Sequence, residues 1–175
     1  YSVGELAAFS AAGVFDASTA ITLATVRAQA MDHCGPSGST GLLALQGPDA
    51  ARQADAADGL SLAIRINPER VIVGGASATL DAHAARWLRE GLRCARLPIG
   101  IASHTPFMLP AVAAFAQHLQ GVRLQAARTP LVCNLTARAT RQPAQLSSAL
   151  AGQISHPIHW DDCMDAVAER QVTCV

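Results

Sequence analysis

The sequence predicts an α/β fold in two parts. Half of its 175 residues are apolar, which suits a chain that buries a sizeable core. Segments with the 3.6-residue apolar spacing of helices alternate with short segments rich in strand-forming residues. Between residues 36 and 98 the expected order is β-α-β-β-α-β, which is typical of a compact ferredoxin-like unit. We expect this unit, residues 36–98, to be inserted into a larger domain formed by residues 1–35 and 99–175.

The elements of the inserted unit follow from local patterns. The stretch from Gly35 to Gly41 is rich in Gly and Ser and is typical of a linker into the unit. After it we expect a strand near 42–46, a helix near 49–57, strands near 60–66 and 70–74, a helix over 77–91 and a strand over 94–97.

The larger domain is expected to be mainly helical where the sequence covers it. A helix over about 6–12 follows Ser2, and Asp16 is a suitable N-cap for a second helix that runs to about His33. Beyond the inserted unit we expect a loop over 100–105, a helix to about Gln120 that Gly121 ends, a strand at 131–135, two further helices and a strand at 172–175.

Composition excludes several function classes. The 13 basic and 13 acidic residues give a formal net charge of zero, so the overall charge favours neither nucleic acid nor a membrane surface as a partner. All 13 basic residues are Arg, which removes Schiff-base, P-loop and kinase lysines from this stretch. No apolar run approaches the roughly 18 residues that span a bilayer.

The five cysteines predict a reducing environment. They are odd in number, widely spaced and without a C-x-x-C pair, so neither a disulfide framework nor a zinc ribbon is indicated. We therefore expect a cytoplasmic protein.

Ser2 is the first candidate for chemistry. It lies in Tyr-Ser-Val-Gly-Glu at the start of a helix, as in an x-Ser-x-Gly nucleophile elbow, where a sharp strand-to-helix turn exposes the serine hydroxyl. Such an elbow favours an α/β-hydrolase-like core. The strand that should precede it, and a glycine expected before Tyr1, are not in the sequence, so we expect the chain to be part of a longer protein. The alternative is an ordinary helix N-cap.

Arg27 is the second candidate. The helix after Asp16 places Arg27 on the same stripe as Leu23 and Met31, where a charge is costly unless it is paired. Arg27 could form a structural salt bridge or extend to solvent at the edge of the stripe. Alternatively, it could hold a substrate carboxylate through two parallel hydrogen bonds.

His104 is the third candidate. It precedes Pro106 in a loop before a helix, and a nearby helix N-terminus disfavours the protonated imidazole, which leaves the neutral form that a general base needs. The alternative is an ordinary surface or capping histidine.

A metal site is not expected. Near the C-terminus, the proline in His-Pro-Ile-His prevents a regular helical pair of ligands. The residues concerned are His156, His159, Asp161, Asp162 and Cys163.

Taken together, these patterns resemble a known family. Ser-Val-Gly-Glu at a helix start, an arginine on the next helix, an inserted β-α-β-β-α-β unit and then Ser-His before a helix resemble the malonyl-CoA:acyl-carrier-protein transacylase family. Its nucleophile motif is Gly-His-Ser-x-Gly-Glu, and Tyr1 stands here in place of the histidine. This variant looks most like the transacylase (epsilon) subunit of bacterial malonate decarboxylase. The segment from Gln153 to Trp160 is similar to the family's Gln-x-x-x-Pro-x-x-Trp pattern.

The resemblance implies a Ser-His dyad. Ser2 would attack the thioester of malonyl-CoA, and His104, oriented by the main-chain carbonyl of Gln153, would take its proton. The resulting malonyl-serine would pass to the phosphopantetheine thiol of an acyl carrier protein, with no bound cofactor. The backbone N–H of Val3 would be one oxyanion donor, while a second donor would belong to a preceding segment.

The resemblance also implies the substrate contacts. Arg27 would hold the free carboxylate of malonate and select against acetyl groups. Asn67, in the Ile-Asn-Pro turn, aligns loosely with a family asparagine near the acyl-CoA. Other malonate decarboxylase subunits would be further partners.

Two other functions stay open at this point. An α/β serine hydrolase or thioesterase would use the same elbow and histidine but would release the acyl group to water, and it needs no cation in its acyl pocket. A non-catalytic assembly subunit would keep the fold with an unreactive Ser2.

Overall fold

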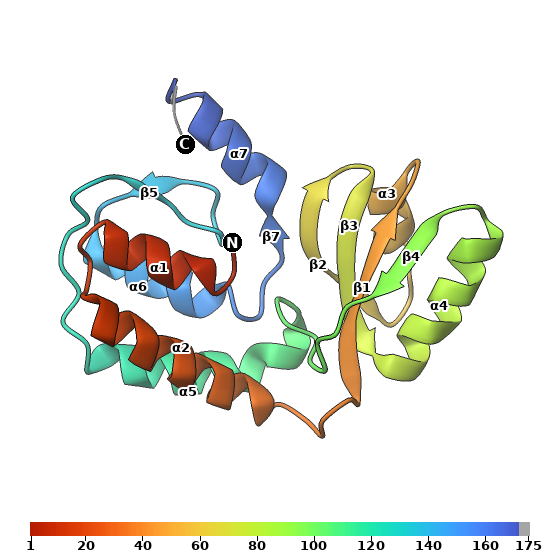
Figure 1. Ribbon diagram of the computed structural model, residues 1–175, viewed down its shortest axis with the longest axis horizontal. Coiled ribbons are helices and arrows are strands. Elements are labelled where there is room, and N and C mark those ends of the chain that lie inside the picture. Colours follow the sequence, from red (N-terminus) through yellow and green to blue (C-terminus); the bar gives the residue numbers. More distant parts are fainter. Residues whose placement is uncertain (172–175) are drawn as a thin grey trace.

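The computed structural model describes residues 1–171 and shows a helical part beside a sheet that carries two helices (Figure 1). Within these residues, no helix is both long enough and apolar enough to cross a membrane. In chain order the elements are α1 (Gly4–Ala11), α2 (Ala17–Asp32), β1 (Thr40–Gln46), α3 (Ala50–Asp55), β2 (Leu60–Asn67), β3 (Arg70–Ala76), α4 (Ser77–Arg89), β4 (Arg93–Arg96), a 3-10 turn (Pro106–Met108), α5 (Leu109–Gln120), β5 (Leu131–Val132), β6 (Ala139–Thr140), α6 (Pro143–Gly152), β7 (Ile158–His159) and α7 (Trp160–Ala168).

The main sheet has the strand order β4-β1-β3-β2-β7. Neighbouring strands among β1 to β4 are antiparallel, and only β7 pairs in parallel, with β2. Because side chains alternate along a strand, β1 sends Leu43 and Leu45 to one face and Leu42 to the other. The first face packs against α3 and α4, where Trp87 is fully buried. On the second face, Leu42 forms one apolar cluster with Ile64, Ile72 and Ile158 of β7.

The helical part has its own core between α1, α2, α5 and α6. Phe9, Leu23, Phe115 and Leu150 are completely buried there, one from each helix. The predicted cap of α2 is present, since the Asp16 carboxylate accepts a hydrogen bond of 2.7 Å from the Thr19 N–H. The apolar spacing of these helices therefore serves to bury one face of each against the others.

The structure differs from the sequence prediction in three short strands. One of them, β6, is not among the expected strands and pairs with β5. The strand expected at 131–135 ends at Val132, because the chain turns at Cys133, whose carbonyl accepts from the N–H groups of Thr136 and Ala137. Strand β7 is not among the expected strands, and its two residues are extended because the edge of β2 pairs with them. The strand expected at 172–175 lies outside the described residues.

A close approach joins the sheet to the loop 102–105. At Gly74 of β3, a Cβ atom would lie 2.8 Å from Cγ2 of Thr105 and 3.0 Å from Leu42. The same loop is held by a 3.1 Å hydrogen bond from the Ala102 N–H to the Thr40 hydroxyl oxygen at the start of β1. The sheet therefore fixes the position of the loop that carries His104.

We predict that Gly74→Ala lowers the free energy of unfolding by about 1–3 kcal/mol, because the added methyl group overpacks against Thr105, which is fully buried. Urea unfolding measures this change. Gly121→Ala is the matched control, since its Cβ would meet only the His118 carbonyl at an ordinary 3.5 Å. Its expected effect is within about 0.5 kcal/mol. Equal effects of the two substitutions would contradict the close-approach argument.

Candidate active site

Ser2 lies in the turn that enters α1, and its hydroxyl faces the interior of the site. Its φ of +57° is unusual for a residue other than glycine and is the kind of strain found at nucleophile elbows. The Oγ atom lies 2.8 Å from Nε2 of His104. Ser2 does not cap the helix, because the N-cap position is Val3 and no side chain caps it. The structure thus places the hydroxyl beside the histidine rather than on the helix end.

His104 is held in one orientation by two consecutive carbonyl groups. Its backbone N–H donates to the Ile154 carbonyl at 2.9 Å, and its ring Nδ1 lies 2.6 Å from the Gln153 carbonyl. A carbonyl can only accept, so Nδ1 carries the proton and Nε2 is free to accept from the Ser2 hydroxyl. This is the tautomer that a general base for Ser2 needs.

The His104 imidazole is neutral at physiological pH. Burial lowers its pKa to about 4, and only 1% of the residue is exposed. The Gln153 carbonyl opposes this shift by bonding the ring, while the charge of Arg27 adds to the lowering. Sequence reasoning attributes the neutral form to a helix N-terminus, whereas the structure points first to burial.

Arg27 lies on α2 and directs its guanidinium to Ser2. It is 7% exposed, and Nη2 donates to the Ser2 Oγ at 3.2 Å. Among residues 1–171 it forms no salt bridge, and its buried Nε has no hydrogen-bond partner. Burial lowers its pKa, which nearby Glu5 opposes. The cation is therefore fixed beside the serine with a donor to spare, which suits an anionic ligand.

Two residues that sequence reasoning missed complete the site. The Asn134 side-chain oxygen accepts from the Ser2 N–H at 2.8 Å. The Glu5 carboxylate accepts from the Asn134 N–H at 2.8 Å and from the Gln153 side-chain amide at 2.6 Å. Glu5 carries a signal in its position three residues after Ser2. Asn134 carries none, since it is 132 residues away in the chain.

The backbone N–H of Val3 is available to a ligand. Val3 is half exposed, and its N–H donates to no acceptor within the described residues. Asn67 is placed differently, at the exposed end of β2, where its side-chain oxygen accepts from the Glu69 N–H at 3.0 Å. Within the described part of the chain, no hydrogen bond joins Asn67 to Ser2, Arg27 or His104.

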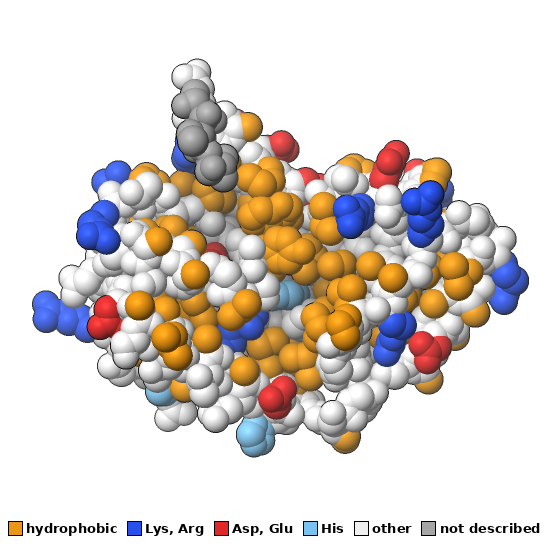
Figure 2. All heavy atoms as spheres, in the orientation of Figure 1, with side chains coloured by type: hydrophobic (Ala, Val, Ile, Leu, Met, Phe, Trp, Pro, Cys, Tyr) orange, Lys and Arg blue, Asp and Glu red, His pale blue; other side chains and the backbone are white. Residues whose placement is uncertain are grey.

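Hydrophobic side chains surround the boundary between the two parts of the molecule. Figure 2 shows them gathered across the middle of this face, with a histidine and a cationic side chain at the centre of the band. The Tyr1 ring meets that of Trp160 edge-on at a centroid distance of 5.2 Å. The tyrosine that precedes Ser2 therefore packs against α7.

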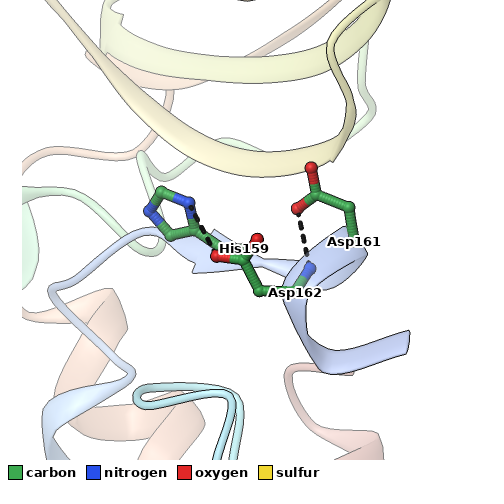
Figure 3. Close-up of side chains that lie close together, drawn as sticks. All are labelled: His159, Asp161 and Asp162. Atoms are coloured by element: carbon green, nitrogen blue, oxygen red, sulfur yellow. Dashed lines mark hydrogen bonds and ion pairs between the residues drawn. The ribbon is translucent and has the colours of Figure 1, made fainter. Parts of the chain in front are cut away.

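The C-terminal cluster forms an ion-pair group. His159, Asp161 and Asp162 lie close together at the start of α7 (Figure 3). Arg65 of β2 donates to Asp161 at 2.6 Å and to Asp162 at 2.7 Å, so an arginine already supplies positive charge to both carboxylates. His156 instead bonds the Gly152 carbonyl.

The site combines a serine hydroxyl, a neutral histidine bonded to it and a fixed cation. This arrangement is typical of α/β enzymes in which a serine forms a covalent ester with an acyl group. Comparison with known proteins gives the family. The model of the acyl transferase domain matches residues 1–173, and the chain belongs to that family.

Relatives of the chain include transacylases and a polyketide synthase. The chain is 27% identical over 179 residues to the malonyl CoA-acyl carrier protein transacylase of Haemophilus influenzae, covering 98% of this chain and 57% of that protein. It is 34% identical over 168 residues to a phenolphthiocerol/phthiocerol polyketide synthase chain of Mycobacterium tuberculosis, covering 95% of this chain and 11% of that protein. The crystal structure of the Xanthomonas oryzae malonyl-CoA:acyl carrier protein transacylase superposes with a TM-score of 0.92 at 28% identity, covering 99% of this chain and 57% of that one. The chain thus spans a little over half of the length of the transacylases it matches.

We predict that His104 titrates near pH 4 and stays neutral at pH 6, because burial penalises its cation. Ring NMR signals recorded between pH 3.5 and 8 measure this directly, and His104→Gln identifies the signal that belongs to His104. A midpoint between pH 6 and 7 would contradict the assignment of a buried neutral base.

Proposed function

We propose that the chain carries the nucleophilic site of a transferase that moves a malonyl group from malonyl-CoA to the thiol of an acyl carrier protein. The observation that carries this proposal is the position of the Ser2 hydroxyl, which lies 2.8 Å from the base nitrogen of His104 and 3.2 Å from the guanidinium of Arg27. A nucleophile beside a fixed cation suits an acyl group that ends in a carboxylate.

In the first half-reaction, Ser2 becomes acylated. Its oxygen attacks the thioester carbonyl of malonyl-CoA while its proton passes to Nε2 of His104. The carbon–sulfur bond then breaks, and the leaving thiolate takes the proton from His104 to give free CoA. The backbone N–H of Val3 supplies one donor to the oxyanion formed between these steps.

In the second half-reaction, the phosphopantetheine thiol of the carrier protein gives its proton to His104 and attacks the malonyl ester. The ester bond to Ser2 breaks, and His104 returns the proton to the serine oxygen. No cofactor is required, because the serine holds the acyl group covalently between its donor and acceptor.

Several finer assignments belong to this proposal. Residues 36–98 form a ferredoxin-like subdomain, and the described residues of the segments 1–35 and 99–175 belong to an α/β-hydrolase-like core. The sheet order 4-1-3-2 of the first four strands and the strained turn at Ser2 support these assignments. A cytoplasmic location is supported by four reduced cysteines among the described residues. Tyr1 before the nucleophile supports a likeness to the malonate decarboxylase transacylase subunit, whose other subunits would then be partners.

Asn67 is proposed to contact the CoA portion of the substrate. Its exposed position at the end of β2 leaves the amide nitrogen available to a ligand, since the hydrogen bond from the Glu69 N–H uses only the side-chain oxygen. An unchanged KM for malonyl-CoA in Asn67→Ala would exclude this contact.

The proposed function is tested by following the fate of the malonyl group in the full-length protein. We expect transfer from malonyl-CoA to a carrier-protein thiol to exceed hydrolysis to free malonate, and Ser2→Ala to reduce transfer by at least about 10³-fold, since the nucleophile is lost. Carrier-protein mass and free malonate report the two routes. Hydrolysis without transfer would identify a thioesterase, and neither reaction would identify an assembly subunit.

Arg27 is predicted to set the preference for malonyl over acetyl groups. Two charge-assisted hydrogen bonds to the carboxylate contribute about 3 kcal/mol, so Arg27→Ala should lower the ratio of kcat/KM values by about 10²-fold. Arg27→Lys should lose part of this preference, because an ammonium keeps the charge but not the paired donors. If the malonyl-to-acetyl ratio in Arg27→Ala stays as in the wild type, the carboxylate is held elsewhere.

A further inference from the structure

Glu5 is a buried carboxylate at the centre of the site whose role the proposed mechanism leaves open. It lies on the first turn of α1, is 4% exposed, and forms no salt bridge among residues 1–171. Both of its oxygens nevertheless have donors. Oε1 accepts from the Asn134 N–H at 2.8 Å, and Oε2 accepts from the Gln153 side-chain amide at 2.6 Å. Burying a carboxylate costs desolvation free energy, and neither of these two hydrogen bonds caps α1.

One branch of this network reaches the nucleophile. Asn134, which donates its N–H to Glu5, accepts the N–H of Ser2 on its side-chain oxygen at 2.8 Å. The Gln153 amide, which donates to Glu5, also donates to the Ser2 carbonyl at 3.3 Å. Both backbone polar groups of Ser2 are therefore bonded to residues that the same carboxylate holds. This matters because Ser2 has a positive φ and would otherwise relax.

The other branch reaches the base. The backbone carbonyl of Gln153 accepts from Nδ1 of His104 at 2.6 Å, and the Gln153 side chain is bonded to Glu5. Gln153 is fully buried, and Glu5 is the charged group to which its side-chain amide donates. A shift of the Gln153 side chain would move the carbonyl that orients the imidazole.

We propose that the Glu5 carboxylate is a positioning residue that holds Ser2 and His104 in their reactive geometry through Asn134 and Gln153. The inference rests on the proposed function only for the identity of the substrate, because the hydrogen bonds that support it do not depend on that function. Among residues 1–171, the Glu5 carboxylate forms no hydrogen bond with the Ser2 hydroxyl or the His104 ring, so it acts through the two residues that it binds.

The network requires the ionised form of Glu5. Both oxygens face N–H donors, and a proton on either oxygen would point at a donor and break one bond. Burial raises the pKa of Glu5 to about 7, while its two hydrogen bonds and the Arg27 charge oppose the rise. The other titratable groups near Glu5 are Arg27 and the Cys133 and Cys163 thiols, and His104 is bonded to the same Gln153.

Acylation of Ser2 should become slower at acidic pH. A raised pKa means that Glu5 loses its charge as pH falls through about 7, so the reactivity of Ser2 should fall over the same range. His104 cannot cause this change, because its pKa lies near 4. We therefore expect a limb near pH 7 in the acylation rate that belongs to Glu5.

The test compares Glu5→Gln with Glu69→Gln, an exposed glutamate in the β2–β3 turn, in the full-length protein. Glutamine keeps the acceptor for Asn134 but turns a donor toward the Gln153 amide. Single-turnover acylation of Ser2 is measured with malonyl-CoA and, separately, with a fluorophosphonate probe, from pH 5.5 to 8.5. We expect Glu5→Gln to acylate about 10- to 100-fold more slowly at pH 8 with both reagents, with KM for malonyl-CoA within about twofold and the pH 7 limb absent.

Each outcome decides the proposal. Wild-type rates or a retained pH 7 limb in Glu5→Gln would overturn it. A Glu5-dependent fluorophosphonate rate without any reaction with malonyl-CoA would sustain the positioning role and reject the proposed function. If Glu5→Gln does not fold, the wild-type profile decides, since a fluorophosphonate rate that is flat from pH 5.5 to 8.5 would overturn the proposal and a limb near pH 7 would support it.

Discussion

The hydrogen bond from the His104 ring to the Gln153 carbonyl is the interaction on which the site depends. It fixes the tautomer, and the tautomer decides whether Nε2 can accept a proton from Ser2. Burial keeps the ring neutral, and the carbonyl limits how far the pKa falls. A carbonyl suits this position because it orients the base without adding a second buried charge next to it. The negative charge of the site lies instead on Glu5, which is separated from the His104 ring by Gln153.

The geometry of the site also depends on how the sheet and the helical part meet. The loop with His104 is bonded to Thr40 of β1 and packs on Gly74 of β3, while the His104 backbone is bonded to Ile154 just beyond α6. Four residues after Ile154, the chain enters β7 and pairs with β2. The same short segment therefore orients the base and joins the edge of the sheet. A shift of this sheet edge would move the carbonyl groups that orient His104.

Local patterns predicted most helices and strands, because caps and apolar spacing act over a few residues. Asp16 and the apolar stripe of α2 are examples, and Ser2, Arg27 and His104 stood out because each residue type is unusual in its local setting. Local patterns could not predict that these three residues lie close together; only the resemblance to a known family predicted it. Strand β7 could not be predicted, since two residues have no pattern of their own and become extended by pairing with β2. The link from Glu5 to Asn134 joins positions 129 apart, which no local signal reveals.

In the reaction we propose, Ser2 carries a malonyl group that Arg27 holds by its carboxylate. Mass spectrometry of the Ser2 peptide, after brief incubation of the full-length protein with malonyl-CoA or acetyl-CoA, tests it most directly. We expect a malonyl adduct on Ser2, much less acetyl adduct, and no adduct in Ser2→Ala. An unmodified Ser2 peptide while malonyl-CoA is consumed would contradict it.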